Sequence, residues 1–213
     1  MRDLLAYDGT IYDANCLVYY VFYIQESDSV GNSVIIEGPY TGRARRITEI
    51  LLAKRKKIRT LRVAWEEAEK VTISSALKEA IRDGSIQQRL GLKGKPTSMF
   101  EYRLAGRLRA ELAGLKRQVW LLIEPAFVPD PARISALKKV YEAFCLDPEK
   151  QKLVPPGKGD PSFVDLSLVL FSSATKLPLL TNDRELYNFS TDLKTMGFCE
   201  LIKAFPHVDL HGA

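Results

Sequence analysis

The stretch LLTNDRELYNF, residues 179–189, places Thr181, Asn182 and Asp183 directly after a short apolar run. The apolar run is typical of a buried strand, and the residues after Asp183 favour a helix. The three polar residues therefore stand at the expected carboxyl end of a strand, where loops and helix starts converge in a parallel sheet. Asp183 can cap the helix or hold something charged, and its carboxylate has two oxygens for the two roles.

Strands and helices alternate along the rest of the chain. TIYD, residues 10–13, predicts a strand that ends in an aspartate, and apolar residues at helical spacing predict a helix from Asn15. KIRT, residues 57–60, predicts a short strand before a helix, and FCELIKAF, residues 198–205, contains the last strand-like run. This alternation predicts an α/β fold with a mostly parallel central sheet.

The middle of the chain favours helices. Ser98 begins a capping-box pattern ahead of leucines at helical spacing, and Asp130 and Asp160 each precede a proline and are expected as helix N-caps. VWLLI, residues 119–123, fits either a strand or the buried end of a helix. We therefore expect a single domain over residues 1–213, with a helical insertion at about 80–145.

The composition fits one globular domain, because the 213 residues are 46% hydrophobic and 27% charged. No apolar run approaches a membrane-spanning length and the start lacks the apolar segment of a signal peptide, so we expect a cytoplasmic protein without membrane contact. The three cysteines are scattered and the two histidines lie near the end of the chain, which disfavours zinc sites and histidine-dependent catalysis. Catalysis would then depend on carboxylates.

The formal net charge of +5 arises mainly from two basic regions. After a predicted loop at residues 31–39, a basic amphipathic helix carries the candidate nucleic-acid-binding residues Arg43, Arg45, Arg46, Lys54 and Arg55. The second region comprises Arg89, Lys93, Lys95, Arg103, Arg107, Arg109, Lys116 and Arg117. Each region alone is typical of a solvated helix face, but the two together favour a nucleic-acid partner.

Four carboxylates from distant segments are expected to meet at the carboxyl edge of the sheet. Asp13 and Asp183 end predicted strands, Asp165 lies near the start of a helix, and Glu66 lies on the helix that follows residues 57–60. Carboxylates held together repel one another unless they bind a cation or a proton. Oxygen ligands without histidine or cysteine select hard ions, so the pattern predicts Mg²⁺ or Mn²⁺ and the hydrolysis of phosphodiester bonds.

Each of these acids also has a purely structural interpretation. Asp183 precedes a helix as an N-cap would, and Asp165 follows Ser162 at capping-box spacing. Glu66 belongs to the acidic run EEAE, where most side chains are solvated, and its neighbour Glu67 is the alternative second acid. Asp13 has the weakest structural explanation, because an aspartate at the end of an apolar strand is costly unless it binds something.

These motifs together resemble the PIN-domain nucleases. IYDANCLVYYVF, residues 11–22, is similar to the family's strand-end aspartate followed by asparagine, and TLRVAWEE, residues 60–67, to its glutamate-bearing helix. SFVDLSLVLFSSA, residues 162–174, is similar to the third acidic motif, and LPLLTNDREL, residues 177–186, to the TxD end of a strand. The interval between the second and third motifs is longer than in compact members of the family.

The resemblance implies a Rossmann-like α/β/α sandwich and a Mg²⁺- or Mn²⁺-dependent endoribonuclease. Its metal-binding acids would be Asp13, Glu66, Asp165 and Asp183, with Asn15 and Thr181 as polar supports and Glu185 as a water-mediated ligand. Members are often the toxin of a VapC-type toxin–antitoxin pair and often dimeric. An antitoxin protein and a second copy of the chain are thus implied as partners beside RNA.

Other functions fit the same residues. A four-acid site does not by itself read the 2′-hydroxyl, so a DNA-cleaving nuclease is one alternative. A PIN-like module that binds RNA or docks a partner without turnover is another. A phosphohydrolase of the haloacid dehalogenase type would require a second aspartate in place of Asn15, which disfavours it.

Overall fold

A five-stranded sheet, parallel throughout, forms the centre of the computed structural model, which describes residues 1–82, 84–93, 97–154 and 161–210. Its strand order is β5 (Leu121–Glu124), β4 (Lys57–Leu61), β1 (Gly9–Tyr12), β6 (Leu179–Thr181) and β7 (Ile202–Ala204). The central strand β1 pairs with both neighbours, so that Ile11 lies opposite Arg59 on one side and Leu179 on the other. The predicted α/β fold with a mostly parallel sheet is confirmed.

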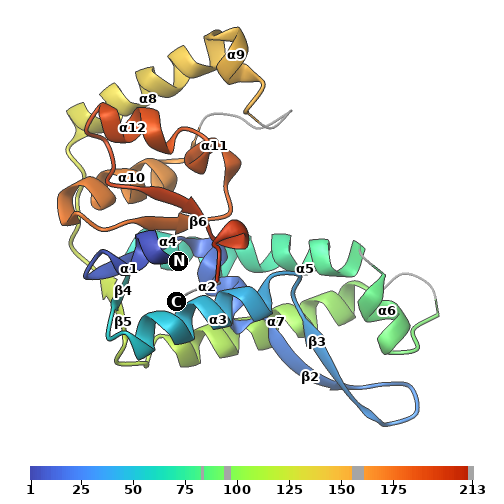
Figure 1. Cartoon of the computed structure of the whole chain (residues 1–213). Helices are drawn as coiled ribbons and strands as arrows, with labels where there is room; N and C mark the ends of the chain where they lie inside the picture. Colours follow the sequence, from blue (N-terminus) through green and yellow to red (C-terminus); the bar gives the residue numbers. More distant parts are fainter. Residues whose placement is uncertain (83, 94–96, 155–160, 211–213) are drawn as a thin grey trace.

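Helices cover both faces of the sheet and make a Rossmann-like α/β/α sandwich (Figure 1). One face carries α2 (Ala14–Val21), α3 (Thr41–Ala53) and α7 (Ser98–Leu115), and the other carries α8 (Pro131–Leu146), α10 (Phe163–Thr175) and α12 (Ser190–Thr195). Successive strand residues point to opposite faces, so Tyr12 and Leu180 join the first core while Ile11 and Leu179 join the second. Four short helical segments adjoin these elements. α1 (Arg2–Leu5) precedes β1, α9 (Pro148–Gln151) follows α8, α11 (Arg184–Tyr187) follows β6, and η2 (Phe205–His207) follows β7.

A β-hairpin takes up most of the predicted loop at residues 31–39 and also residues 23–27 before it, where the helix predicted from Asn15 was expected to continue to Ile24. β2 (Tyr23–Ser27) and β3 (Ser33–Glu37) pair antiparallel and project away from the sheet (Figure 1). Two residues of β2, Ile24 and Glu26, point inward and are buried. Glu26 forms ion pairs with Arg103 (3.4 Å) and Arg107 (3.0 Å) of α7. The hairpin is thus fixed by a helix about 80 residues away in the sequence, a contact that local pattern does not reveal.

The region expected to be a helical insertion also completes the main sheet. α5 (Ile73–Arg82), α6 (Ser85–Arg89) and α7 precede β5, and β5 pairs parallel with β4. The ambiguous segment at residues 119–123 therefore contributes the edge strand. Thr97 caps α7 one residue earlier than predicted, whereas Asp130 caps α8 as expected. Asp160 lies outside the described residues, and Ser162 is the N-cap of α10.

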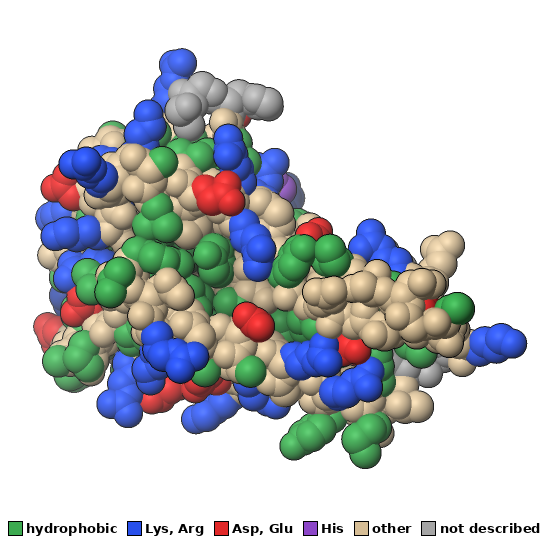
Figure 2. All heavy atoms as spheres, turned by 90° about the horizontal axis from the view of Figure 1, so that it is seen from below, with side chains coloured by type: hydrophobic (Ala, Val, Ile, Leu, Met, Phe, Trp, Pro, Cys, Tyr) green, Lys and Arg blue, Asp and Glu red, His purple; other side chains and the backbone are tan. Residues whose placement is uncertain are grey.

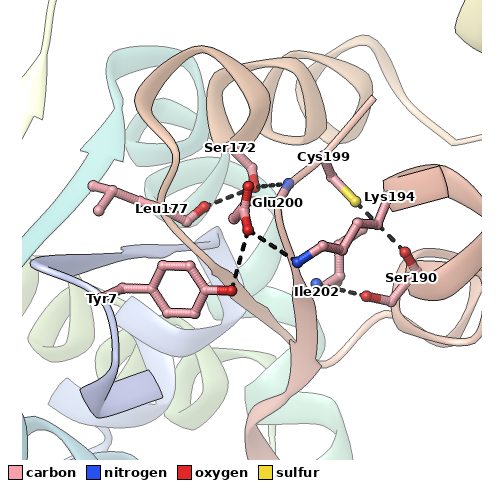
Figure 3. Close-up of polar contacts among 8 residues, drawn as sticks. All are labelled: Tyr7, Ser172, Leu177, Ser190, Lys194, Cys199, Glu200 and Ile202. Carbon is pink, nitrogen blue, oxygen red and sulfur yellow. Dashed lines mark hydrogen bonds and ion pairs between the residues drawn. The ribbon is translucent and has the colours of Figure 1, made fainter. Parts of the chain in front are cut away.

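A polar network holds the amino ends of the strands (Figure 3). The carboxylate of Glu200, just before β7, accepts hydrogen bonds from the Tyr7 hydroxyl (3.2 Å) and the Lys194 ammonium (2.9 Å). The Glu200 backbone N–H donates to the Ser172 hydroxyl, which donates to the Leu177 carbonyl (3.0 and 2.7 Å). These contacts tie α10 and α12 to the starts of β1, β6 and β7, and they lie at the opposite edge from the acidic residues.

No helix in the described part of the chain combines the length and the apolar character needed to cross a bilayer.

Candidate metal centre

A cleft of about 400 Å³ opens at the carboxyl edge of the sheet and is lined by carboxylates. It is bounded by the start of α2, by the start of α10, by the loop from β6 to α11, and by a continuous helical run. That run consists of α4 (Arg62–Glu67), a π-helical turn η1 (Ala68–Thr72) and α5. The acids that line it are Asp13, Glu67, Glu79, Asp165, Asp183 and Glu185, and no described lysine or arginine lines it.

Asp13 lies at the bottom of this cleft, with only 1% of its surface exposed. It is the N-cap of α2, and its Oδ1 accepts a hydrogen bond from the backbone N–H of Ala14 (2.6 Å). Its Oδ2 accepts hydrogen bonds from the Asn15 amide (2.7 Å) and the Thr181 hydroxyl (2.6 Å). Burial, followed by the negative charges of Asp183 and Asp165, raises the pKa of Asp13 well above its ordinary value.

Asn15 and Thr181 join the ends of β1 and β6, as expected for polar supports. The Asn15 amide lies 3.4 Å from Asp183 Oδ2, and its carbonyl oxygen accepts a hydrogen bond from the backbone N–H of Asn182 (3.0 Å). Thr181 Oγ1 accepts a hydrogen bond from the backbone N–H of Asp183 (3.0 Å) while its proton goes to Asp13. The pair thereby fixes the two strand-end aspartates relative to each other.

Asp183 stands at the N-cap position of α11, yet its side chain makes no cap hydrogen bond to that helix. The backbone carbonyl of Asp183 accepts the N–H of Leu186 instead (3.1 Å). The capping role that its position suggested is therefore not used. Its carboxylate belongs to the acidic cleft.

Asp165 enters the cleft from α10 and also completes a capping box. Its Oδ2 accepts the backbone N–H of Ser162 (2.8 Å), and the Ser162 hydroxyl accepts the backbone N–H of Asp165 (3.2 Å). Burial and the charge of Asp183 raise the pKa of Asp165 to about 6. The structural and electrostatic interpretations thus both apply to this residue, because a carboxylate has a second oxygen left after capping.

The three aspartates are close enough to share one cation. Each of Asp13, Asp165 and Asp183 offers a carboxylate oxygen, and these atoms all lie within 4.8 Å of one another. The donor set contains oxygen alone, which suits Mg²⁺ or Mn²⁺ better than zinc. Burial combined with mutual repulsion leaves protonation or cation binding as the ways to lower the energy of the site.

Glu67, rather than Glu66, lies in the cleft. Burial, then Asp165 and Asp183, raise the pKa of Glu67 to about 7. Glu66 points away, with 43% of its side chain exposed, and pairs with Arg62 one turn earlier (3.0 Å). The expectation that Glu66 joins the three aspartates is corrected by this placement. Arginine four residues before Glu66 was a signal in the sequence for a solvated ion pair.

One part of the cleft wall was not anticipated. Tyr19 and Glu79 line it, and the Tyr19 hydroxyl donates a hydrogen bond to the Glu79 carboxylate. Glu185 is buried and lines the cleft, so it stays near the position expected for a more distant ligand. Lining positions recur at residues 67, 71, 72, 75, 76 and 79, a helical spacing that identifies this face only once the cleft is known.

The basic residues proposed to bind nucleic acid lie outside the cleft. On α3, Arg43 donates to the Val208 carbonyl, Arg45 to the Tyr20 carbonyl (3.1 Å), and Arg46 pairs with exposed Glu49 (3.4 Å). Lys54 and Arg55 follow the end of α3, just before β4 starts, which is the sheet edge away from the acids. From below, on the side of α3 and α7, lysine and arginine side chains are scattered among hydrophobic ones (Figure 2).

The second basic region also has local partners. Arg103 and Arg107 pair with Glu26, Arg109 donates to the Glu69 carbonyl (3.2 Å), and Lys95 lies outside the described residues. These contacts give several of its cations a structural role in holding the hairpin and α7.

Comparisons of the chain with family models, with curated proteins and with solved structures found no match. The resemblance to PIN-domain nucleases stays a prediction from the motifs.

The raised pKa values lead us to expect that the stability of the fold depends on pH and on a bound cation. Between the ordinary carboxyl pKa values and about 7, the native state binds more protons than the unfolded chain, so the free energy of unfolding falls as pH rises. In EDTA we expect Tm to drop between about pH 5 and about pH 8, and Mn²⁺ or Mg²⁺ to restore it mainly at the higher pH.

Thermal unfolding followed by circular dichroism checks this expectation, with Na⁺ at matched ionic strength as the control for charge screening. An equal effect of Na⁺ and Mn²⁺, or a Tm that rises with pH in EDTA, would contradict a cation site at these acids.

Proposed function

We propose that this chain is a metal-dependent, PIN-like nuclease that hydrolyses phosphodiester bonds of RNA. The observation that carries the proposal is the meeting of Asp13, Asp165 and Asp183 within 4.8 Å. These residues come from three distant segments and line a cleft that no described lysine or arginine lines. A hard divalent ion bound there would neutralise the carboxylates, polarise a phosphate and make a bound water more acidic. The choice of RNA over DNA follows the resemblance. The cytoplasm, the location expected from the hydropathy of the sequence, is part of the proposal.

The chain's own residues have separable parts in this chemistry. Asn15 and Thr181 hold Asp13 and Asp183 in place through hydrogen bonds of 2.6 to 3.4 Å, which preorganises the ligands. Glu67, with a pKa of about 7, can accept a proton from the attacking water at neutral pH. Tyr19 and Glu79, which also line the cleft, offer hydrogen-bonding groups to the substrate's sugars or bases.

The test is cleavage of labelled single-stranded RNA and DNA of the same sequence by the purified chain. We expect RNA cleavage with Mg²⁺ or Mn²⁺, none in EDTA, and a loss of at least about 100-fold in Asp13→Asn, because the cleft loses a ligand charge. Cleavage that persists in EDTA or in Asp13→Asn would refute the proposal. Binding without cleavage under any metal would instead identify a binding module, and cleavage of DNA alone would identify a deoxyribonuclease.

A further inference from the structure

A second cleft, of about 380 Å³, adjoins α11 and differs from the metal centre in charge. We call it the basic groove. Its lining residues are Lys152, Leu153, Val154, Arg184, Tyr187, Asn188 and His207. None of these described residues is acidic, whereas the metal centre is lined by carboxylates and by no described lysine or arginine.

The two clefts share one short helix. Asp183 precedes α11 and Glu185 lies in its first turn, and both line the metal centre. Arg184 and Tyr187 belong to the same turn but line the basic groove, where Arg184 is exposed. Neighbouring residues of one helical turn thus face two different clefts. A nucleic-acid strand that leaves the metal centre therefore has only the width of α11 to cross before it reaches the basic groove.

The groove contains a pair of aromatic rings. The rings of Tyr187 and His207 lie 6.4 Å apart, centre to centre, at an angle of 84°. Tyr187 is partly buried against the second core, which restrains its ring, while His207 is exposed. Unpaired bases stack on such rings with little dependence on sequence.

Two cations line the basic groove, and further charged residues lie beside it. Lys152 and Arg184 line it, and within the described part of the chain Lys152 pairs with exposed Glu149, a contact worth little in water. His207 also lines a neighbouring cleft of mixed charge, where Arg2 and Lys203 lie with Asp3 and Asp209 and where Lys203 pairs with Asp3 (2.7 Å). The next residue, Val208, accepts a hydrogen bond from Arg43 of α3. Arg43, a candidate nucleic-acid contact, therefore lies beside this neighbouring cleft.

We propose that the basic groove binds the single-stranded RNA that flanks the scissile phosphodiester, with bases on Tyr187 and His207 and phosphates near Arg184 and Lys152. The inference rests on the proposed function. A strand of several phosphates gains no charge attraction from an acidic cleft, and released counterions at Lys and Arg supply most of the binding in such complexes. The basic groove offers two cations and two aromatic rings on the other side of α11 from the metal centre.

The test measures binding of a labelled RNA of about 12 nucleotides by fluorescence anisotropy, in Mg²⁺, with all proteins carrying Asp13→Asn so that the RNA persists. We expect Tyr187→Leu to weaken binding about tenfold and Tyr187→Phe to retain it, because the phenyl ring still stacks. Arg184→Gln is expected to reduce the slope of log Kd against log salt by about 0.7, the contribution of one single-strand phosphate contact.

Matched controls come from α7 and the turn after it. Tyr102 is 73% exposed and Arg117 is exposed, and neither lines a described cleft. Tyr102→Leu and Arg117→Gln should leave binding within about twofold of the parent. Circular dichroism checks the fold of Tyr187→Leu, and Arg184→Gln replaces an exposed side chain.

Failure of this inference is distinguishable from failure of the proposed function. If the native chain cleaves RNA but the groove variants bind the labelled RNA as the parent does, the groove assignment is overturned and the nuclease remains. If the labelled RNA binds with the expected losses but no metal supports cleavage, the groove stands and the nuclease proposal fails. No measurable RNA binding by the parent would overturn the groove assignment.

Discussion

Asp165→Asn is expected to lower RNA cleavage by at least about 100-fold while raising Tm in EDTA at about pH 8 by several degrees. The asparagine oxygen can still accept the backbone N–H of Ser162, so the cap of α10 is retained. What the variant loses is a negative charge beside Asp13 and Asp183. Metal-dependent activity and stability should therefore change in opposite directions.

The sign of the stability change follows from the pKa of Asp165, which burial and Asp183 raise from 3.8 to about 6. At about pH 8 the native carboxylate is ionised although its surroundings disfavour the charge. At about 1.4 kcal/mol per pKa unit, this destabilises the fold by roughly 3 kcal/mol as an upper bound. The neutral amide removes this destabilisation. At about pH 5 the native carboxyl is mostly protonated, so the difference in Tm between variant and parent should shrink.

Asp130→Asn is the matched control. Asp130 is an exposed N-cap of α8 whose side chain accepts the N–H of Ala132 (2.9 Å), and asparagine caps equally well. Cleavage rates and Tm should stay near those of the parent at both pH values. If Asp165→Asn lowered Tm in EDTA at about pH 8, repulsion among the three aspartates would not be the main destabilising interaction at the site. If the variant left cleavage intact, Asp165 would not take part in catalysis.

Glu67→Gln is expected to lower cleavage about 10- to 100-fold near neutral pH, while Glu66→Gln changes it by less than about twofold. Glu67 lines the cleft with a pKa raised to about 7, so it can hold a metal or exchange a proton. Glu66 is paired with Arg62 at the surface and contacts nothing in the cleft. The two variants make the same Glu-to-Gln change at adjacent positions, so each is the control for the other.

The pH dependence of cleavage separates the possible roles of Glu67. In the parent, the rate should rise as pH passes through about 7, because the ionised carboxylate is the active form. In Glu67→Gln this rise should be absent and the remaining activity should be flatter with pH. If the two variants lost cleavage activity equally, or if only Glu66→Gln lost it, the assignment of Glu67 as the second acid would be wrong. Glu66, which the sequence favoured, would again be the candidate.

Local patterns in the sequence were sufficient for the fold class and for three of the acids. The alternation of short apolar runs with helices predicted the parallel sheet, and the polar residues after two of those runs placed Asp13 and Asp183 at its carboxyl edge. The spacing of Ser162 and Asp165 predicted a capping box, which is present. These inferences depend only on periodicity of about two or 3.6 residues and on cap chemistry, both of which act over a few neighbouring residues.

The remaining features depend on contacts between distant segments, and only the tertiary structure decided them. The hairpin of β2 and β3 is fixed by Arg103 and Arg107, and residues 121–124 become an edge strand because β4 lies beside them. Glu67 faces the cleft because the run from α4 through a π-helical turn packs against α2 and α10, and this packing sets the rotation of the helix. The sequence by itself determined which side chains end the strands; packing determined which helix face turns toward them, since that rotation is set by partners far away in the chain.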